Sequence, residues 1–269
     1  MLYGLYQSAQ GAAVQQRRLE ATAHNLANAG TTGFKPDVAV VRTVPQFERA
    51  LDAVFDRLNL PDAGDAVIGG GLADDRGLEH HNGATALADI VTDFSNGPIQ
   101  KTGGQLDVAI SGPGFFRVGT VDRSFLTRNG DFVVDAEGTL VTADGGLPVL
   151  DSSGRPIVLP LDAVDIGIGS SGLVTDRLAT IADIELVQPL DPHSLTKLGG
   201  SLYADDVETA PVNPADTRLL QGYLESSGSE PMQEMVSMVE ITRAFEMNMT
   251  MIQTQDASLG MLLKAASQV

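Results

Sequence analysis

The sequence of 269 residues contains no cysteine. This absence excludes a disulfide framework, a thiolate nucleophile and a thiolate metal site. Basic residues are also scarce, since 17 lysines and arginines stand against 35 aspartates and glutamates, for a formal net charge of −18. A surface of this sign repels phosphate backbones and anionic lipid, so we expect neither nucleic acid nor a membrane surface as a partner.

Long apolar runs are missing as well. No stretch of about 18 apolar residues occurs, so the sequence predicts no membrane-spanning helix. The N-terminal region has no basic start followed by an apolar core, because its first basic residues, Arg17 and Arg18, come after the mildly apolar stretch. This order predicts that the protein has no cleavable secretory signal peptide.

The N-terminal region has the spacing of a helix that packs against another helix. Its apolar or small residues alternate four and three apart, which predicts a narrow coiled-coil seam. The seam positions are Leu5, Ala9, Ala12, Gln16, Leu19, Ala23 and Leu26. Beyond the seam, Asn28 and Gly30 are candidates for a left-handed residue that ends the helix, and Gly33 permits a tight change of direction before Phe34.

The C-terminal region predicts one long helix that starts near Pro231, because neither glycine nor proline occurs between Met232 and Leu259. Two lines of residues repeat every seven positions: Met238, Phe245, Ile252, Leu259 and Ala266 form the first, and Met235, Thr242, Met249, Asp256 and Leu263 form the second. Seven of the eight methionines lie in this region, and thioether side chains suit adaptable interfaces. Two ordinary helices on a globular core remain the alternative.

The middle of the chain has the pattern of an antiparallel β body. Turn-forming residues recur roughly every 8 to 12 positions between short β-rich runs. These runs are residues 106–110, 114–118, 125–126, 132–134, 139–141, 157–159, 163–168 and 181–187. Upstream, helical spacing predicts a short helix at about 46–58, and the Gly- and Asp-rich stretch 61–83 predicts a mobile loop.

Candidate sites for chemistry fail on context. Residues 167–172 have the glycine spacing of a dinucleotide-binding loop, but turn and strand patterns follow where a helix should begin. The adjacent His80 and His81 point apart on any regular backbone, so they form no ready metal chelate. Ser111 lacks the glycine two positions before it that a nucleophile elbow needs. We therefore predict no catalytic residue, no metal, no cofactor and no small-molecule substrate.

Three separated blocks carry a resemblance to a known family. The first is HNLANAGTTGFK at residues 24–35. The second consists of NGPIQKTGG, LDVAISGPGFFRV and FLTRNGDFVVDAEGTLVTADGGLPVL, between residues 96 and 150. The third is QGYLESSGSEPMQEMVSMVEITRAFEMNMTMIQTQD at residues 221–256. In this order they resemble bacterial flagellar basal-body rod proteins, which are related to hook proteins.

The resemblance implies an α+β fold with an inserted body. We expect residues 1–35 and 222–269 to pair as a coiled-coil-like axial domain, residues 36–90 to form a connecting segment, and residues 91–221 to form a mainly antiparallel β body. We assign the following residues to the assembly interface: Leu5, Leu19, Asn25, Leu26, Asn28, Gly33, Phe34, Met238, Phe245, Met249, Ile252, Leu259 and Leu263.

The same resemblance implies a structural role rather than an enzymatic one. The subunit would polymerise with itself into a helical tube around an export channel and transmit torque. It would contact other rod and hook proteins, ring proteins and the type III export apparatus, and lie in the periplasmic part of the basal body. The length leaves room for one middle body, which favours the longer rod proteins. Among these we favour the distal rod over its slightly proximal relative. The alternatives are a hook or hook-associated subunit and, more distantly, a secreted β-rich binding protein or enzyme.

Overall fold

The computed structural model of the protein describes residues 2–45, 83–120, 123–160, 165–177 and 179–266. The chain divides into two compact units, of which the first comprises Met1–Thr22, Val38–Ile90 and Val236–Val269, and the second Ala23–Asp37 and Val91–Met235. Long helices and antiparallel strands make the chain α+β, as expected. The predicted helix at 46–58 and nearly all of the predicted loop at 61–83 lie outside the described residues.

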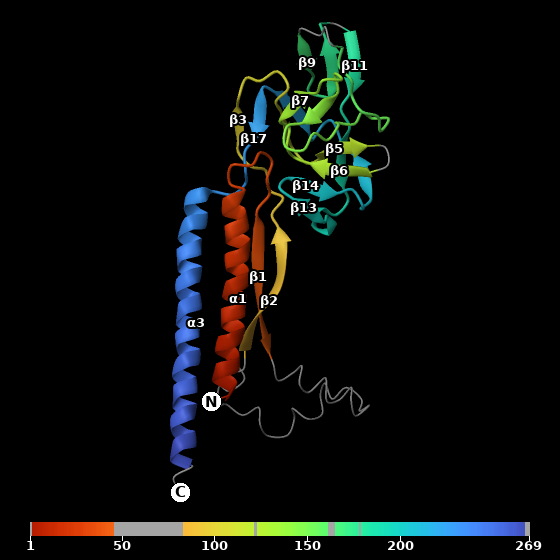
Figure 1. Ribbon diagram of the computed structural model, residues 1–269. Helices are drawn as coiled ribbons and strands as arrows, with labels where there is room; N and C mark the ends of the chain where they lie inside the picture. Colours follow the sequence, from red (N-terminus) through yellow and green to blue (C-terminus); the bar gives the residue numbers. More distant parts are fainter. Residues whose placement is uncertain (1, 46–82, 121–122, 161–164, 178, 267–269) are drawn as a thin grey trace, which may run out of the picture. The chain divides into compact units, whose positions relative to one another are not determined.

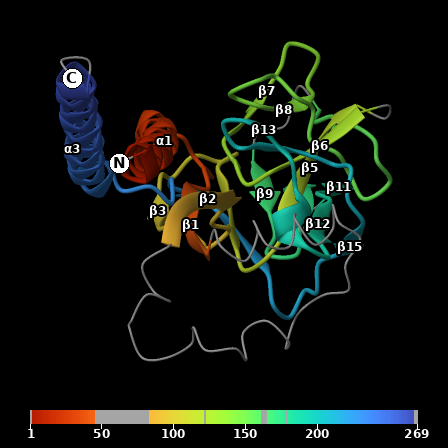
Figure 2. The same ribbon diagram turned by 90° about the horizontal axis from the view of Figure 1, so that it is seen from below.

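The first unit consists of two helices and a two-stranded sheet. Helix α1 (Leu2–Ala27) lies between helix α3 (Pro231–Ala266) and the paired strands β1 (Asp37–Pro45) and β2 (Gly83–Thr92), as Figures 1 and 2 show. The long C-terminal helix that begins at Pro231 is confirmed. The two strands arise in the segment that the sequence indicated as a connection. Within the described residues, no helix is long and apolar enough to cross a membrane.

Helices α1 and α3 run antiparallel and approach at two glycines of α1. A Cβ on Gly4 would stand 2.8 Å from Gln255 Nε2, and one on Gly11 would stand 3.0 Å from Asn248 Oδ1. A step of seven residues along α1, from Gly4 to Gly11, thus corresponds to a step of seven residues in the opposite direction along α3, from Gln255 to Asn248. This spacing places Asn248 and Gln255 on the face of α3 that is turned to α1.

The less exposed face of α3 agrees better with one of the two predicted lines. Its members include Met238, Ile241, Phe245, Asn248, Ile252, Gln255 and Leu259. The first line, through Phe245 and Ile252, lies on this face where its side chains are described. In the second line Thr242 is half-buried, but Met235, Met249 and Asp256 are exposed. The sequence pattern followed sevenfold repeats of mostly apolar residues, whereas glycine on α1 leaves room for the amides of Asn248 and Gln255.

Helix α1 is covered over a wider arc than a single seam. Ala12 is buried and Leu5, Leu19 and Leu26 are half-buried, as the predicted seam requires, but Ala9, Gln16 and Ala23 are exposed. Val14 and Ala21, which lie off the seam, are buried. A second neighbour explains the difference, because the β1–β2 sheet lies on the side of α1 away from α3 (Figure 1).

The second unit holds the β body, in which every recorded strand pair is antiparallel. Its largest sheet has the order β13-β14-β6-β5-β12-β15. In that order the strands are Lys197–Gly199, Leu202–Ala204, Arg123–Thr127, Phe115–Thr120, Leu186–Pro189 and Thr209–Pro211. Smaller sheets pair β3 (Ile99–Lys101) with β17 (Tyr223–Glu225), β4 (Val108–Ser111) with β16 (Arg218–Gln221), and β7 (Phe132–Val134) with β8 (Leu140–Thr142).

A three-stranded sheet of β9 (Ile166–Ile168), β10 (Leu173–Asp176) and β11 (Ala179–Asp183) contains the glycine-rich segment 167–172. Strand β10 begins directly after Gly172, which has a φ of 103°, so this segment is a turn between strands, as predicted. The main core of the body includes Phe116, Val118 and Phe132, and Phe116 and Phe132 pack edge to face with centroids 5.1 Å apart.

The strand predictions succeed best in the first half of the body. Strands β4 to β8 coincide with predicted runs, whereas residues 157–159 contribute only isolated bridges and the run 181–187 divides between β11 and β12. Strands β3 and β13 to β17 were not predicted. Each of these six has three or four residues, which is too short for an alternating pattern to show.

Candidate assembly surface and helix junction

The end of α1 is closed by a side chain rather than by a left-handed residue. Neither Asn28 nor Gly30 has a positive φ, so this part of the prediction is wrong. Instead, Asn28 Nδ2 donates to the His24 carbonyl oxygen at 2.9 Å, and Asn28 Oδ1 accepts from Thr31 Oγ1 at 3.3 Å. The asparagine side chain thereby gives the His24 carbonyl a second donor, beside the Asn28 backbone amide at 3.2 Å.

The change of direction occurs at Gly33, as predicted, with a φ of 66°. A Cβ at this position would stand 2.5 Å from the Arg128 carbonyl carbon and 2.6 Å from the Asn129 nitrogen. The Gly33 amide donates to the Glu225 carbonyl oxygen at 2.8 Å, and the Gly228 amide donates to the Phe34 carbonyl oxygen at 2.9 Å. Glycine is therefore required both for the left-handed backbone and for close approach.

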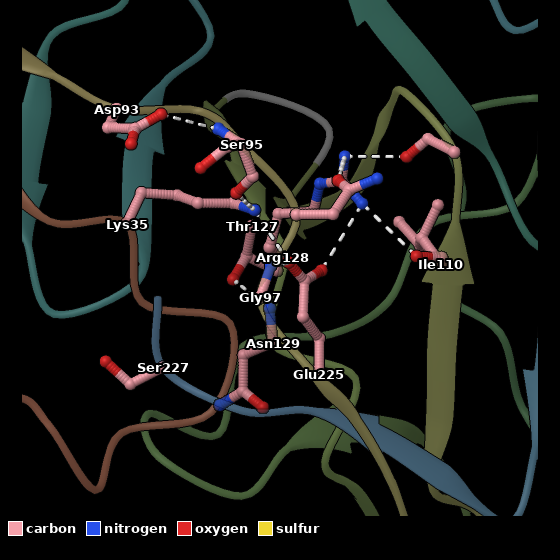
Figure 3. Close-up of polar contacts among 12 residues, drawn as sticks. Lys35, Asp93, Ser95, Gly97, Ile110, Thr127, Arg128, Asn129, Glu225 and Ser227 are labelled. Carbon is pink, nitrogen blue, oxygen red and sulfur yellow. Dashed lines mark hydrogen bonds and ion pairs between the residues drawn. The ribbon is translucent and has the colours of Figure 1, made fainter. Parts of the chain in front are cut away.

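A buried ion cluster lies next to this turn and joins Lys35, Arg128 and Glu225 (Figure 3). Lys35 Nζ stands 2.6 Å from Glu225 Oε1, and Arg128 Nη1 stands 3.3 Å from Glu225 Oε2. The side chains of Lys35 and Glu225 are each 1% exposed, and that of Arg128 is 4% exposed. Buried charges of this kind are costly unless they are paired and hydrogen-bonded.

Backbone groups satisfy much of the remaining hydrogen-bonding capacity of the cluster. Lys35 Nζ donates to the Ser95 carbonyl oxygen at 2.7 Å, and the Gly97 amide donates to Glu225 Oε1 at 2.8 Å. Arg128 Nη2 donates to the Gly112 carbonyl oxygen at 2.8 Å. The guanidinium also lies over the Phe115 ring, 5.4 Å from its centroid. The cluster therefore links the α1 exit, the β body and the α3 entry.

Burial dominates the electrostatics of the cluster. It lowers the pKa of the Lys35 ammonium and the pKa of the Arg128 guanidinium, while the Glu225 carboxylate acts in the opposite direction on both. Burial also raises the pKa of the nearby Tyr203 phenol. Two cations thus depend on a single carboxylate, which makes Glu225 the member whose loss leaves most charge unpaired.

Asn25 connects the last turns of α1 to the first turn of α3. It exchanges two 2.9 Å hydrogen bonds with the Asp37 backbone, and its Nδ2 also donates to Glu234 Oε1 at 3.3 Å. The Asp37 carboxylate accepts from Lys197 Nζ at 3.1 Å and lies 3.3 Å from His24 Nδ1. The Lys197 ammonium in addition lies over the Phe34 ring, 4.1 Å from its centroid. Asn25 and Phe34 are therefore junction residues within the second unit.

The sequence interpretation missed Lys35, Arg128 and Glu225, although each lies in one of the three resemblance blocks. The sequence offered one sign that these charges are buried, which is a charged residue next to an apolar one, as in Phe34-Lys35 and Leu224-Glu225. Charged residues are usually exposed. Nothing in the chain's spacing shows that these three meet.

The predicted interface residues that are described and at least partly covered fall into three groups. Asn25, Asn28, Gly33 and Phe34 come together at the junction. Leu5, Leu19 and Leu26 are half-buried on α1. Met238, Phe245, Ile252 and Leu259 lie on the inward face of α3. The side chain of Leu263 lies outside the described residues, and Met249 is exposed. Contact of any of these residues with another copy stays a prediction.

Helix α3 also exposes many large apolar side chains away from its inward face. They are Met232, Met235, Val236, Val239, Met247, Met249, Met251 and Met261. Met247 is 67% exposed and Met261 is 72% exposed, in a protein with a strongly acidic composition. Contiguous exposed apolar residues mark interaction surfaces. We call this set the outer α3 surface.

Comparison with known families accounts for most of the chain. A profile described as "Flagella basal body rod protein" matches residues 5–35. One described as "Flagellar hook protein FlgE/F/G D1 domain" matches residues 109–176, and one described as "Flagellar basal body rod FlgEFG protein C-terminal" matches residues 220–265.

Whole-chain relatives agree with these profiles. The chain is 34% identical over 232 residues to the flagellar basal-body rod protein FlgF of Caulobacter vibrioides, covering 86% of this chain and 84% of the relative. It is 32% identical over 271 residues to the rod protein FlgG of Bacillus subtilis, covering 96% and 97%. The chain belongs to the flagellar basal-body rod protein family. The three matched segments each supply one residue to the ion cluster of this rod protein: Lys35, Arg128 and Glu225.

Proposed function

We propose that this rod protein is a structural subunit that polymerises through its two terminal helices, which pair as a coiled-coil-like axial domain. The observation that carries the proposal is the outer α3 surface. Large apolar side chains exposed together on one element normally mark a surface that another protein covers. One side of α3 is turned to α1, and copies of the same chain would cover the outer surface.

The spacing on the inward face supports the coiled-coil-like pairing. Met238, Ile241, Phe245, Asn248 and Ile252 alternate three and four apart on α3. Contacts between the outer α3 surface of one copy and a different surface of the next would be heterologous. Such contacts do not close on themselves and so generate an open helical tube. That tube would enclose the export channel and transmit torque.

The helices would complete their folding during assembly. A narrow helix pair buries little apolar surface, which weakly offsets the entropy lost when the chain becomes ordered. Circular dichroism of dilute monomer and of polymer tests this step, with helix content expected to increase on polymerisation. Equal helix content in both states would contradict it.

The proposed position within the flagellum is supported by the family and by a length that has room for one middle body. We favour the distal rod, in the periplasmic part of the basal body, over its slightly proximal relative. Neighbouring rod and hook proteins would be the direct partners, with ring proteins and the type III export apparatus as further partners. The role is structural, with no small-molecule substrate, and export would need no cleavable signal peptide.

A hook or hook-associated subunit is the second candidate. The match of residues 109–176 to a profile whose description names the hook protein favours it. Electron microscopy of basal bodies that carry a labelled copy of the chain separates the two. Label on the rod below the outer-membrane ring is expected, and label above that ring would establish the hook assignment.

Substitution on the outer α3 surface tests the assembly mechanism. We expect Met247→Asp to abolish polymerisation of the purified chain, measured by sedimentation and electron microscopy, while the monomer's circular dichroism stays unchanged. Leu190→Asp is the matched control, because Leu190 is 68% exposed on the β body and Met247 is 67% exposed. Normal polymers of Met247→Asp would refute the assignment of this surface.

A further inference from the structure

We infer that the cluster of Lys35, Arg128 and Glu225 is a latch that holds the segments of the second unit together. The latch keeps the roots of both helices, which are residues 23–27 of α1 and 231–235 of α3, folded with the β body. The inference builds on the proposed function, in which the helices become fully ordered on assembly. It places the limit of that disorder at Ala23 and Met235, rather than at residues 35 and 222, where the sequence divided the chain.

Backbone hydrogen bonds already join the three segments. The α1 exit and the α3 entry are cross-linked by Gly33 donating to Glu225 and by Gly228 donating to Phe34. The α3 entry also pairs with the body, because the Ser226 amide donates to the Pro98 carbonyl oxygen at 2.9 Å. A Cβ on Gly97 would overlap the Ser226 carbonyl oxygen, so these backbones are in close contact.

The charges make this closure depend on all three segments. If the segment with Glu225 is detached, Lys35 and Arg128 lose the carboxylate that they share in the buried cluster. If the segment with Lys35 is detached, Glu225 loses an ion pair of 2.6 Å. Each partial structure holds an unpaired buried charge, which is strongly unfavourable. The segments are therefore expected to open and close as one cooperative unit.

The roots of the helices are attached to the same unit by polar contacts. Asn25 bonds Asp37 and Glu234, and Ser229 Oγ donates to Glu234 Oε1 at 3.2 Å. Farther along α3 the side chains are less buried. Among the α3 side chains that the structure describes, only that of Ile241 is buried. Because of this contrast, we expect α3 to be stably folded up to about Met235, where the second unit ends, and to be less stable beyond it.

Site-resolved amide hydrogen exchange on the full-length monomer, at a concentration too low for polymerisation, tests the latch. The amides of Gly33, Gly97 and Gly228 are expected to exchange as slowly as that of Val118 in the β core. Amides at residues 5–20 and 240–262 are expected to exchange about tenfold faster or more. Exchange at Gly33 and Gly228 about tenfold or more faster than at Val118 would overturn the inference.

The variant Glu225→Gln tests the ion cluster directly. Glutamine replaces one carboxylate oxygen with a donor NH₂ group that must face Lys35 or Arg128, neither of which can accept. Exchange at Gly33 and Gly228 should rise about tenfold or more while Val118 stays protected. Arg155→Gln is the control, because it removes an ion pair with Asp151 in which the arginine is 75% exposed, and no change at Gly33 or Gly228 is expected.

Two further outcomes have defined meanings. If Glu225→Gln also removes protection from Val118, Lys35→Met becomes the deciding variant, because Arg128 still pairs with Glu225. Faster exchange at Gly33 and Gly228 alone then supports the latch, and unchanged exchange there overturns it. Slow exchange at residues 5–20 in a monomer that never polymerises would refute the proposed function while leaving the latch supported by the response to Glu225→Gln.

Discussion

Replacement of Gly33 by alanine is the most informative single change in the junction. The backbone there has a φ of 66°, which costs an L-residue about 1–2 kcal/mol. The new Cβ would stand 2.5 Å from the Arg128 carbonyl carbon and 2.6 Å from the Arg128 carbonyl oxygen, neither of which belongs to a flexible side chain. Overpacking of this kind adds about 1–3 kcal/mol. We therefore expect Gly33→Ala to lower the free energy of unfolding by about 2–5 kcal/mol.

Urea unfolding of the monomer, followed by near-ultraviolet circular dichroism, measures this change. The buried Tyr203 contributes to that signal and reports on the β body. With a denaturant slope of about 2–3 kcal/mol per molar urea, the midpoint should fall by roughly 1–2 M.

The matched control is Gly30→Ala, three residues earlier. Gly30 has no left-handed φ, and a Cβ there would meet no atom within 4 Å. We expect this control to unfold at or slightly above the wild-type midpoint, because alanine restricts the unfolded chain. Equal destabilisation by the two variants would refute the assignment of the turn to Gly33.

Three further predictions concern the helices and the charges. Phe245→Asp should block polymerisation seen by electron microscopy yet leave the near-ultraviolet signal of the β body intact; normal filaments would contradict the inward assignment of Phe245. Burial, together with Asp107 and Asp144, raises the pKa of Asp131 above its ordinary 3.8, so Asp131→Asn should increase the thermal midpoint at pH 7. That gain should disappear as the pH falls through the raised pKa toward 3.8, because the wild-type carboxyl then becomes neutral in both states; a gain that persists at pH 3 would refute this cause. Finally, a net charge of −18 makes copies repel, so raising the salt from about 0.01 M to about 0.15 M should lower the protein concentration needed for polymerisation in sedimentation assays. An unchanged threshold would argue against charge repulsion.

Helix predictions succeeded where the pattern was long. Thirty-six residues of α3 contain enough sevenfold repeats to identify one inward line, and the absence of glycine and proline identified its length. The second line failed because the residues that approach Gly4 and Gly11 are the amides of Gln255 and Asn248. Hydrophobic periodicity does not register polar residues that pack against glycine.

The junction could be predicted only in part. A turn at Gly33 followed from the residue type, since glycine alone adopts this conformation without strain. The residue type did not predict that the Asn28 side chain closes α1 or that Asn25 pairs with Glu234. Asparagine can end a helix either in a left-handed conformation or through a side-chain hydrogen bond to the backbone.

The sequence by itself determined the absence of cysteine chemistry, the two terminal helices and the family. Those conclusions rest on composition, on long local periodicity and on ordered motifs, all of which are properties of the linear chain. Only the tertiary structure decided that Lys35, Arg128 and Glu225 meet in one buried cluster and that the helix roots belong with the β body. These residues are separated by 93 and 97 positions, and local preferences carry no information about which distant charges will share a site.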